Sequence, residues 1–329
     1  MAIMSGDIVL EVRDLHTHFF LRRGVVKVVD GVSFSLRRGE VLGLVGESGC
    51  GKSVTALSLL RLLPQPAART VQGEVLLDGE NLLTKSNQEM RQIRGRKIAM
   101  ILQDPQTSLN PVFTIGDQLR ESIAKHHPGQ AGTVTQRAIE ALRKVKLAAP
   151  EQRMHQYPHQ MSGGMKQRVV GAIAISCEPQ VMIADEPTTA LDVTIQLQYL
   201  KLLKELQQNS DMAILFITHD FGIVAKMCDR VAVMYAGRIV ESGPVRQVFD
   251  NPRHPYTQAL IASVPKMRQQ VGRLHTIEGQ PPEFSDLPRG CRFAPRCPLA
   301  DERCQTTYPL SFALGSEHTA DCWRLEAAA

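Results

Sequence analysis

The chain has 329 residues, of which 43% are hydrophobic and 22% charged, and its formal net charge is +5. This is the composition of a soluble globular protein with one large domain or two, long enough to bury about 75% of its unfolded surface. The mild charge requires no nucleic-acid partner, and the N-terminus lacks a secretory signal. No apolar run approaches the ~18 residues of a membrane span, so we expect a cytosolic protein that binds no nucleic acid.

Short apolar runs alternate with helical patterns along the chain, which predicts an α/β fold built on a parallel sheet. The predicted strands are residues 40–46, 97–103, 181–185, 213–219 and 230–235. Their near-continuous apolar character is typical of strands that are buried on both faces.

The middle of the chain lacks strand patterns from residue 110 to about 160. Residues 114–127 and 133–147 have helical spacing instead, and Thr133 with Gln136 is expected to form a capping box. We therefore predict a helical subdomain inserted between strands. Beyond residue 243 prolines become frequent, with one short helix predicted within 252–265 and a linker leading into a cysteine-bearing tail.

The sequence GESGCGKS at residues 46–53 follows a predicted strand and precedes an apolar helix. In that setting its backbone N–H groups can surround a phosphate, Lys52 reaches the β- and γ-phosphates, and the Ser53 hydroxyl ligates Mg²⁺. The residues assigned to nucleotide binding are Gly46, Ser48, Gly49, Cys50, Gly51, Lys52 and Ser53. The alternative is a glycine-rich turn that matches by chance, which the strand–helix context disfavours. Cys50 itself is most simply a tolerated small residue.

Polar side chains end three of the predicted strands. Asp185 follows an apolar strand and is expected to hold Mg²⁺, while Glu186 is placed to accept a proton from the water that attacks the γ-phosphate. His219 is expected to polarise the γ-phosphate, and Gln103 to contact Mg²⁺ or the attacking water. The alternatives are solvated loop acids and a structural histidine, which the shared position at strand ends disfavours.

The sequence MSGGMKQR at residues 161–168 opens a helix with Ser162, Gly163 and Gly164, which makes a second anion-binding N-terminus. Because the chain already has one phosphate loop, this second site indicates a phosphate bound between two subunits.

Together these residues resemble the nucleotide-binding subunit of ATP-binding cassette (ABC) transporters, over nearly the whole chain. The resemblance implies a P-loop NTPase fold with a RecA-like parallel sheet, an antiparallel β subdomain and a helical subdomain at about 105–165. It implies a nucleotide-binding domain at 1–250 and an extension at 251–329. It also implies that Asp192 ends the D-loop and that Phe19, or alternatively Phe20, stacks on adenine.

The sequences QDPQTSLNP at 103–111 and RHPYTQALIASVP at 253–265 are similar to the peptide and nickel importer branch. This resemblance implies an ATPase that drives import of di- or oligopeptides on the cytoplasmic face of the bacterial inner membrane. The implied partners are a second ATPase subunit of related sequence in a head-to-tail dimer, two transmembrane permease subunits and an extracytoplasmic substrate-binding protein. A nickel importer remains an alternative, whereas a soluble ABC ATPase of translation or repair is disfavoured by the single cassette. The helix start at Ser162–Gly164 resembles the signature motif of the family, which usually reads Leu-Ser-Gly-Gly-Gln. Met161 and Met165 replace its first and last residues, so one amide side chain is lost.

Four of the seven cysteines lie near the C-terminus, at Cys291, Cys297, Cys304 and Cys322. In a reducing compartment such a cluster indicates a metal rather than disulfides. No tight Cys-x₂₋₄-Cys pair is present, which disfavours structural zinc, although zinc and a metal-free tail both remain alternatives. Four widely spaced thiolates can hold an iron–sulfur cluster, and the branch resemblance implies a four-iron four-sulfur cluster there.

Overall fold

The computed structural model describes residues 8–127, 131–189, 191–264, 276–315 and 317–326. The chain divides into two compact units. The first unit comprises Met1–Leu10, Leu36–Glu40 and Thr84–Phe216, and the second comprises Glu11–Ser35, Val41–Leu83 and Ile217–Ala329. No helix among the described residues has the length and apolar character needed to cross a membrane.

The second unit contains a small sheet of strand order β2-β1-β4-β5. Its strands are β1 (Ile8–Leu21), β2 (Gly24–Arg37), β4 (Ala68–Leu77) and β5 (Glu80–Asn81). The same unit contains strands in the order β11-β12-β10-β9-β3. These are β3 (Val41–Val45), β9 (Arg230–Tyr235), β10 (Arg238–Pro244), β11 (Phe312–Ala313) and β12 (Thr319–Ala320). β3 and β9 are parallel, whereas β10 runs antiparallel to both β9 and β12.

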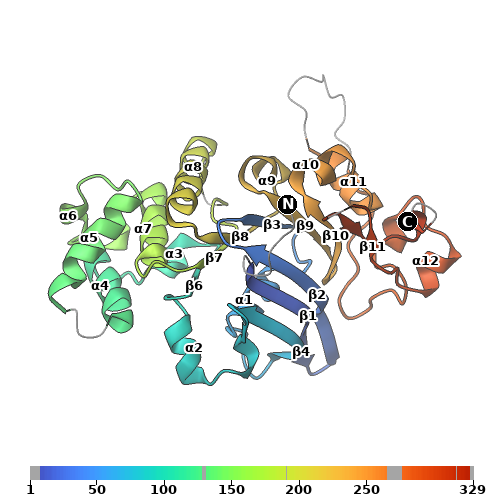
Figure 1. The fold of residues 1–329 in the computed structure, drawn as a ribbon, viewed down its shortest axis with the longest axis horizontal. Coiled ribbons are helices and arrows are strands. Elements are labelled where there is room, and N and C mark those ends of the chain that lie inside the picture. Colours follow the sequence, from blue (N-terminus) through green and yellow to red (C-terminus); the bar gives the residue numbers. More distant parts are fainter. Residues whose placement is uncertain (1–7, 128–130, 190, 265–275, 316, 327–329) are drawn as a thin grey trace. The chain divides into compact units, whose positions relative to one another are not determined.

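Short helices accompany these strands in the second unit (Figure 1). They are α1 (Lys52–Leu59), α9 (Phe221–Met227), α10 (Val245–Asp250), α11 (Pro255–Ala262) and α12 (Glu302–Thr306). Their core joins β9 to the C-terminal segment, because Tyr235 of β9, Tyr256 of α11 and Phe293 belong to one buried cluster. The ring centroids of Tyr235 and Tyr256 are 4.5 Å apart, and that of Phe293 is 5.3 Å from each.

The first unit contains the strand order β8-β7-β6, with β6 and β7 parallel. The strands are β6 (Ile98–Ile101), β7 (Val181–Asp185) and β8 (Ala213–Thr218), whose last two residues fall in the second unit. Its helices are α2 (Asn87–Ile93), α3 (Pro105–Ser108), α4 (Ile115–His126), α5 (Val134–Lys144), α6 (Pro150–Arg153), α7 (Gly163–Ile175) and α8 (Val193–Ser210). Helices α4, α5 and α7 pack on one another, in the green part of Figure 1. The first two lie within the predicted helical subdomain.

The strands expected from apolar runs are confirmed, with β7 and β9 matching residue for residue. β3, β7 and β8 are buried along their whole length, as expected of strands covered on both faces. The capping box predicted at Thr133 is wrong. Residues 131–133 form a 3₁₀ turn that leaves Thr133 in a helical conformation, so its side chain makes no capping hydrogen bond. Capping boxes occur instead at Thr114–Asp117 of α4 and Ser86–Glu89 of α2.

Candidate nucleotide-binding site

Residues 46–53, the P-loop, form the turn between β3 and α1, as their strand–helix context predicts. Gly51 is the N-cap of α1 with φ 110°. Gly46 has φ 156°, and a Cβ there would lie 2.1 Å from the carbonyl oxygen of Met234. At Gly49, by contrast, a Cβ would meet no atom within 4 Å. Gly49 itself has φ 79°, so the backbone conformation depends on glycine in the middle of the loop as well as at both ends.

Lys52 lies folded across the loop that it is expected to use for phosphate binding. Its buried Nζ donates to the carbonyl oxygens of Gly46 at 2.8 Å and Glu47 at 2.9 Å. A phosphate oxygen can replace these carbonyls as acceptor. Cys50 is buried beside it, with Sγ 3.7 Å from the ammonium, and burial raises the pKa of the thiol despite that charge. This environment agrees with the small-residue interpretation of Cys50. Ser48 and Ser53 are exposed.

Glu186 and Gln103 are in contact within the first unit. Glu186 follows β7 in the left-handed region, with φ 45°, an unusual conformation for glutamate. Its Oε2 accepts a hydrogen bond from Gln103 Nε2 at 3.0 Å and another from the Thr189 hydroxyl at 3.0 Å. Asp185, at the end of the same strand, is buried. The sequence interpretation did not include Thr189, and the local signal for it is only its position three residues after Glu186.

The signature and D-loop residues occupy helix starts. The Ser162 hydroxyl caps α7 by accepting the N–H of Met165 at 3.4 Å. Asp192 caps α8 by accepting the N–H groups of Thr194 and Ile195 at 3.1 and 3.0 Å. Gly163 has open space around it, and a Cβ on Gly164 would lie 2.8 Å from Ile195 Cγ2, so the signature helix packs closely on the start of α8. Ala190, within the D-loop at 189–192, lies outside the described residues.

His219 and the aromatic candidates for adenine stacking lie in the second unit. His219 directly follows β8 and is exposed. The Arg69 guanidinium lies over the Phe20 ring, 4.3 Å from the ring centroid. Phe19 is half-buried at the end of β1. Because Arg69 covers one face of Phe20, we keep Phe19 as the expected stacking residue.

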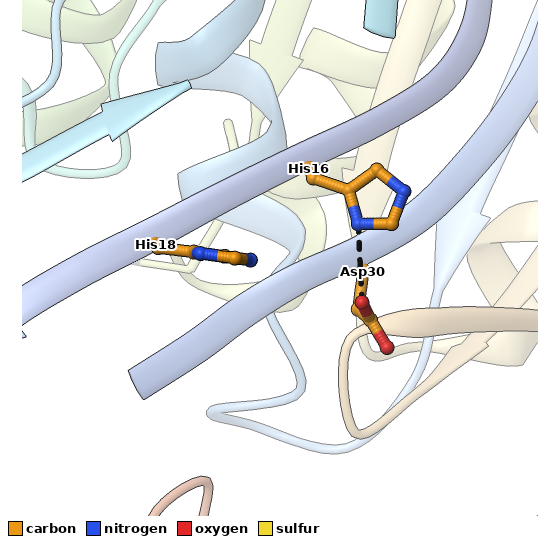
Figure 2. Close-up of side chains that lie close together, drawn as sticks. All are labelled: His16, His18 and Asp30. Atoms are coloured by element: carbon orange, nitrogen blue, oxygen red, sulfur yellow. Dashed lines mark hydrogen bonds and ion pairs between the residues drawn. The ribbon is translucent and has the colours of Figure 1, made fainter. Parts of the chain in front are cut away.

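A cluster that the sequence interpretation missed joins β1 and β2. Ligand atoms of His16, His18 and Asp30 lie within 4.8 Å of one another, and Figure 2 shows His16 directing Nδ1 toward Asp30, at 3.1 Å. The other carboxylate oxygen accepts hydrogen bonds from Arg238, at 3.1 and 2.9 Å, and from Arg292. Two guanidinium groups already balance this carboxylate, so we interpret the cluster as a buried ion-pair centre rather than a metal site. Burial alone would raise the pKa of Asp30, but the hydrogen bond from Arg238 and the charge of Arg292 outweigh it and lower that pKa.

The four cysteines of the C-terminal segment lie around one cavity. Cys291, Cys297, Cys304 and Cys322 line one small cavity, and the Cys291 N–H donates to the Cys304 carbonyl at 2.8 Å. Three of the sulfurs accept a backbone N–H from the residue two positions later: Phe293 to Cys291, Leu299 to Cys297 and Arg324 to Cys322. Burial nevertheless raises the pKa of Cys291 to about 11. Among the residues that the structure describes, no three of these thiols lie within 4.8 Å of one another.

A phosphate loop at a strand–helix turn in one unit, and an apolar strand that ends in an acidic residue in the other, are the features of a P-loop nucleoside-triphosphate-binding protein. Comparison with known proteins narrows this class. Residues 29–189 match the ABC transporter family, and residues 240–304 match the oligopeptide/dipeptide transporter, C-terminal region.

Curated relatives match almost end to end. The chain is 51% identical to a Sinorhizobium fredii protein named "Probable peptide ABC transporter ATP-binding protein", over 97% of this chain and 96% of that protein. It is 47% identical to the dipeptide transport ATP-binding protein DppD of Bacillus subtilis, over 96% and 94%. Among solved structures, cbiO1 from Clostridium perfringens, part of the ABC transporter complex cbiONQ, is 28% identical with a TM-score of 0.64, over 74% of this chain and 92% of that one. The chain therefore belongs to the ABC transporter family as an ATP-binding subunit, and its enzymatic activity is ATP hydrolysis.

Proposed function

We propose that this chain is the ATP-hydrolysing subunit of an importer for di- or oligopeptides. The observation that carries this proposal is the combination of an ABC cassette with the oligopeptide/dipeptide transporter C-terminal region in one chain. The names of the relatives from Sinorhizobium fredii and Bacillus subtilis, which refer to peptide and dipeptide transport, support it.

Mg²⁺ fits the donor set that we assign to it. The Ser53 hydroxyl, the Asp185 carboxylate and the Gln103 carboxamide all offer oxygen, which Mg²⁺ prefers. When bound, the ion would offset the negative charge of the phosphates. Lys52 would add a positive charge on the same phosphates, and His219 would hydrogen-bond the γ-phosphate.

Glu186 is the proposed general base. It takes a proton from water as the water oxygen bonds to the γ-phosphorus and the bond to the ADP oxygen breaks, giving ADP and inorganic phosphate. Thr189 and Gln103 support this role because their hydrogen bonds fix Oε2 of Glu186. An oriented carboxylate avoids the cost of ordering the base during the reaction.

We further propose a head-to-tail dimer in which the P-loop of one subunit and Ser162–Gly164 of the other bind the same ATP. Val193, directly after the D-loop, is 71% exposed and supports a subunit contact there. Tipping a transporter between two states from 1:99 to 99:1 requires about 5.5 kcal/mol, which differential binding of the γ-phosphate can supply. The second ATPase is expected to be a related chain.

The proposed partners beyond the second ATPase are two permease subunits and an extracytoplasmic binding protein, which would hold this chain at the cytoplasmic face of the membrane. Val112 and Phe113, which follow the Gln103 loop, are 71% and 51% exposed and offer an apolar surface for a permease. In this assembly residues 1–250 would form the nucleotide-binding domain, with its helical subdomain at about 105–165, and 251–329 the extension.

For the extension we propose a four-iron four-sulfur cluster on Cys291, Cys297, Cys304 and Cys322. The donor set fits, since soft thiolates line one cavity and three of them accept backbone N–H groups, which stabilise sulfur ligands. Tetrahedral zinc at 2.3 Å from each sulfur would bring the sulfurs within about 3.8 Å of one another. The wider separation of the thiols favours the larger cluster. When bound, the cluster would cross-link a segment that has only a small hydrophobic core.

Two experiments test these proposals. The intact complex, purified with its binding protein, should show ATPase stimulation by dipeptides or longer peptides; stimulation by nickel alone would replace the peptide assignment with the nickel alternative. Anaerobic purification followed by a visible spectrum and iron and sulfide analysis should give about four of each per chain. Stoichiometric zinc without iron would rule out the iron–sulfur assignment.

A further inference from the structure

Glu47, the second residue of the P-loop, is held at every polar group. Its carbonyl accepts from Lys52, as described above. Its N–H donates to the Tyr256 hydroxyl at 2.9 Å. Its carboxylate accepts two hydrogen bonds from the Arg296 guanidinium, at 2.7 and 3.0 Å. Two of these three groups are therefore bound by residues of the C-terminal part of the chain, Tyr256 and Arg296. Both residues belong to the same compact unit as the loop.

Arg296 is buried and is held by several hydrogen bonds, which it would lose if it moved away from Glu47. Its side chain is 4% exposed, and its Nε donates to the carbonyl of Glu278 at 3.0 Å. The guanidinium also donates to the Tyr235 hydroxyl at 3.3 Å. A bidentate pair between a guanidinium and a carboxylate fixes orientation as well as distance. The link from Arg296 to Glu47 is thus a rigid connection between the loop and the segment that carries the cysteines.

Tyr256 is equally fixed, because it is fully buried in the aromatic cluster with Tyr235 and Phe293.

The two residues that contact Glu47 lie outside the region that matches the ABC transporter family. Arg296 and Tyr256 lie within residues 240–304, the transporter C-terminal region, whereas the P-loop lies within residues 29–189.

We propose that Arg296 and Tyr256 are positioning residues for ATP binding, which hold Glu47 and thereby keep the P-loop in its phosphate-binding conformation. The proposal rests on ATP binding at the P-loop. The phosphate is expected to be bound by several backbone N–H groups that follow Glu47 in the loop, so the affinity depends on these groups pointing inward before the ligand arrives. If releasing Glu47 lowers the occupancy of that conformation to about one tenth, the dissociation constant rises about tenfold.

A double-mutant cycle separates positioning from simple charge neutralisation. The full-length chain is titrated calorimetrically with the non-hydrolysable ATP analogue adenylyl imidodiphosphate in the presence of Mg²⁺. Arg296→Met, Glu47→Gln and the double variant should each weaken binding by about tenfold, because the pair acts as a unit. If Glu47→Gln alone bound normally and also restored binding to Arg296→Met, Arg296 would serve only to neutralise a charge near the phosphates, and the proposal would be overturned.

Two matched variants serve as controls for a general loss of folding. Arg303 also forms a bidentate pair, with Glu326, and lies in the same extension, so Arg303→Met should leave the affinity unchanged. Tyr256→Phe deletes only a hydroxyl and keeps the ring packing; it should weaken binding about threefold, the loss expected from one hydrogen bond of modest strength.

Hydrogen–deuterium exchange gives a readout independent of nucleotide. In the nucleotide-free chain, residues 46–53 should exchange faster in Arg296→Met and Tyr256→Phe than in the parent or in Arg303→Met. Unchanged exchange together with unchanged affinity would refute the positioning role. Absence of binding in the parent chain would instead contradict ATP binding at the P-loop, on which the proposal rests, so the two failures are distinguishable.

Discussion

The substitution Glu186→Gln tests the assigned general base with little structural disturbance. Oε2 of Glu186 accepts both hydrogen bonds, from Gln103 and from Thr189, each at 3.0 Å. A glutamine whose carbonyl oxygen takes this place can accept both, so the side chain and the unusual backbone conformation are kept. What disappears is the negative charge and the ability to take a proton. We expect the turnover rate to fall by about 10² to 10⁴, which corresponds to about 3 to 5 kcal/mol in the activation barrier.

The assay is the steady-state ATPase rate of the assembled transporter at saturating Mg²⁺ and ATP, measured together with ATP affinity. Affinity should be retained, and the variant should accumulate as a closed dimer with ATP bound. Glu178→Gln is the matched control, since Glu178 also has a positive φ, of 53°, and forms an exposed pair with Lys144. ATP hydrolysis at the parental rate would show that the base is another group, and loss of ATP binding would show that Glu186 is needed for structure.

Two further substitutions test features of the second unit. Gly46→Ala places a methyl group 2.1 Å from the Met234 carbonyl oxygen. We therefore expect the free energy of unfolding, measured with urea, and the affinity for ADP, measured by calorimetry, each to fall by about 3 kcal/mol. Normal binding would contradict the glycine argument. Asp30→Asn removes one partner of a buried ion-pair centre and should cost about 3 kcal/mol near neutral pH. Because the folded pKa of Asp30 lies below 3.8, this difference should persist down to about pH 4 and shrink as the pH falls through the folded pKa. A difference that did not change with pH would assign the loss to shape rather than charge.

The elements that sequence predicted well are those determined by local composition. β7 and β9 are continuous apolar runs next to charged residues, and a strand buried on both faces tolerates little else. β1 and β2 were missed from the residue pattern, and only the family resemblance implied them. In β1 the buried Thr17 stands between two histidines, so no apolar alternation marks the strand. The capping prediction at Thr133 failed because a preceding 3₁₀ turn changed the backbone conformation that a cap requires.

The same distinction applies to the site. The P-loop could be predicted because its residues are contiguous and the strand–helix context is local. The four cysteines could be grouped by composition, although their cavity could not be foreseen. The contact between Glu47 and Arg296 joins residues 249 positions apart, and nothing in either local sequence indicates the other. The Asp30 centre likewise depends on Arg292, which lies 262 positions further along the chain.

The pairing of β12 with β10 has a consequence for how the protein is synthesised. β10 is completed at residue 244, but its antiparallel neighbour at Thr319–Ala320 and the His318 imidazole, 2.8 Å from the buried carboxylate of Glu241, are translated some seventy residues later. Until these residues leave the ribosome, a nascent cassette presents an unpaired strand edge, the kind of surface through which partly made chains associate. A stop codon or a stall within this interval therefore exposes β10 and leaves Glu241 without its imidazole, so premature products are expected to aggregate rather than to serve as shortened ATPases.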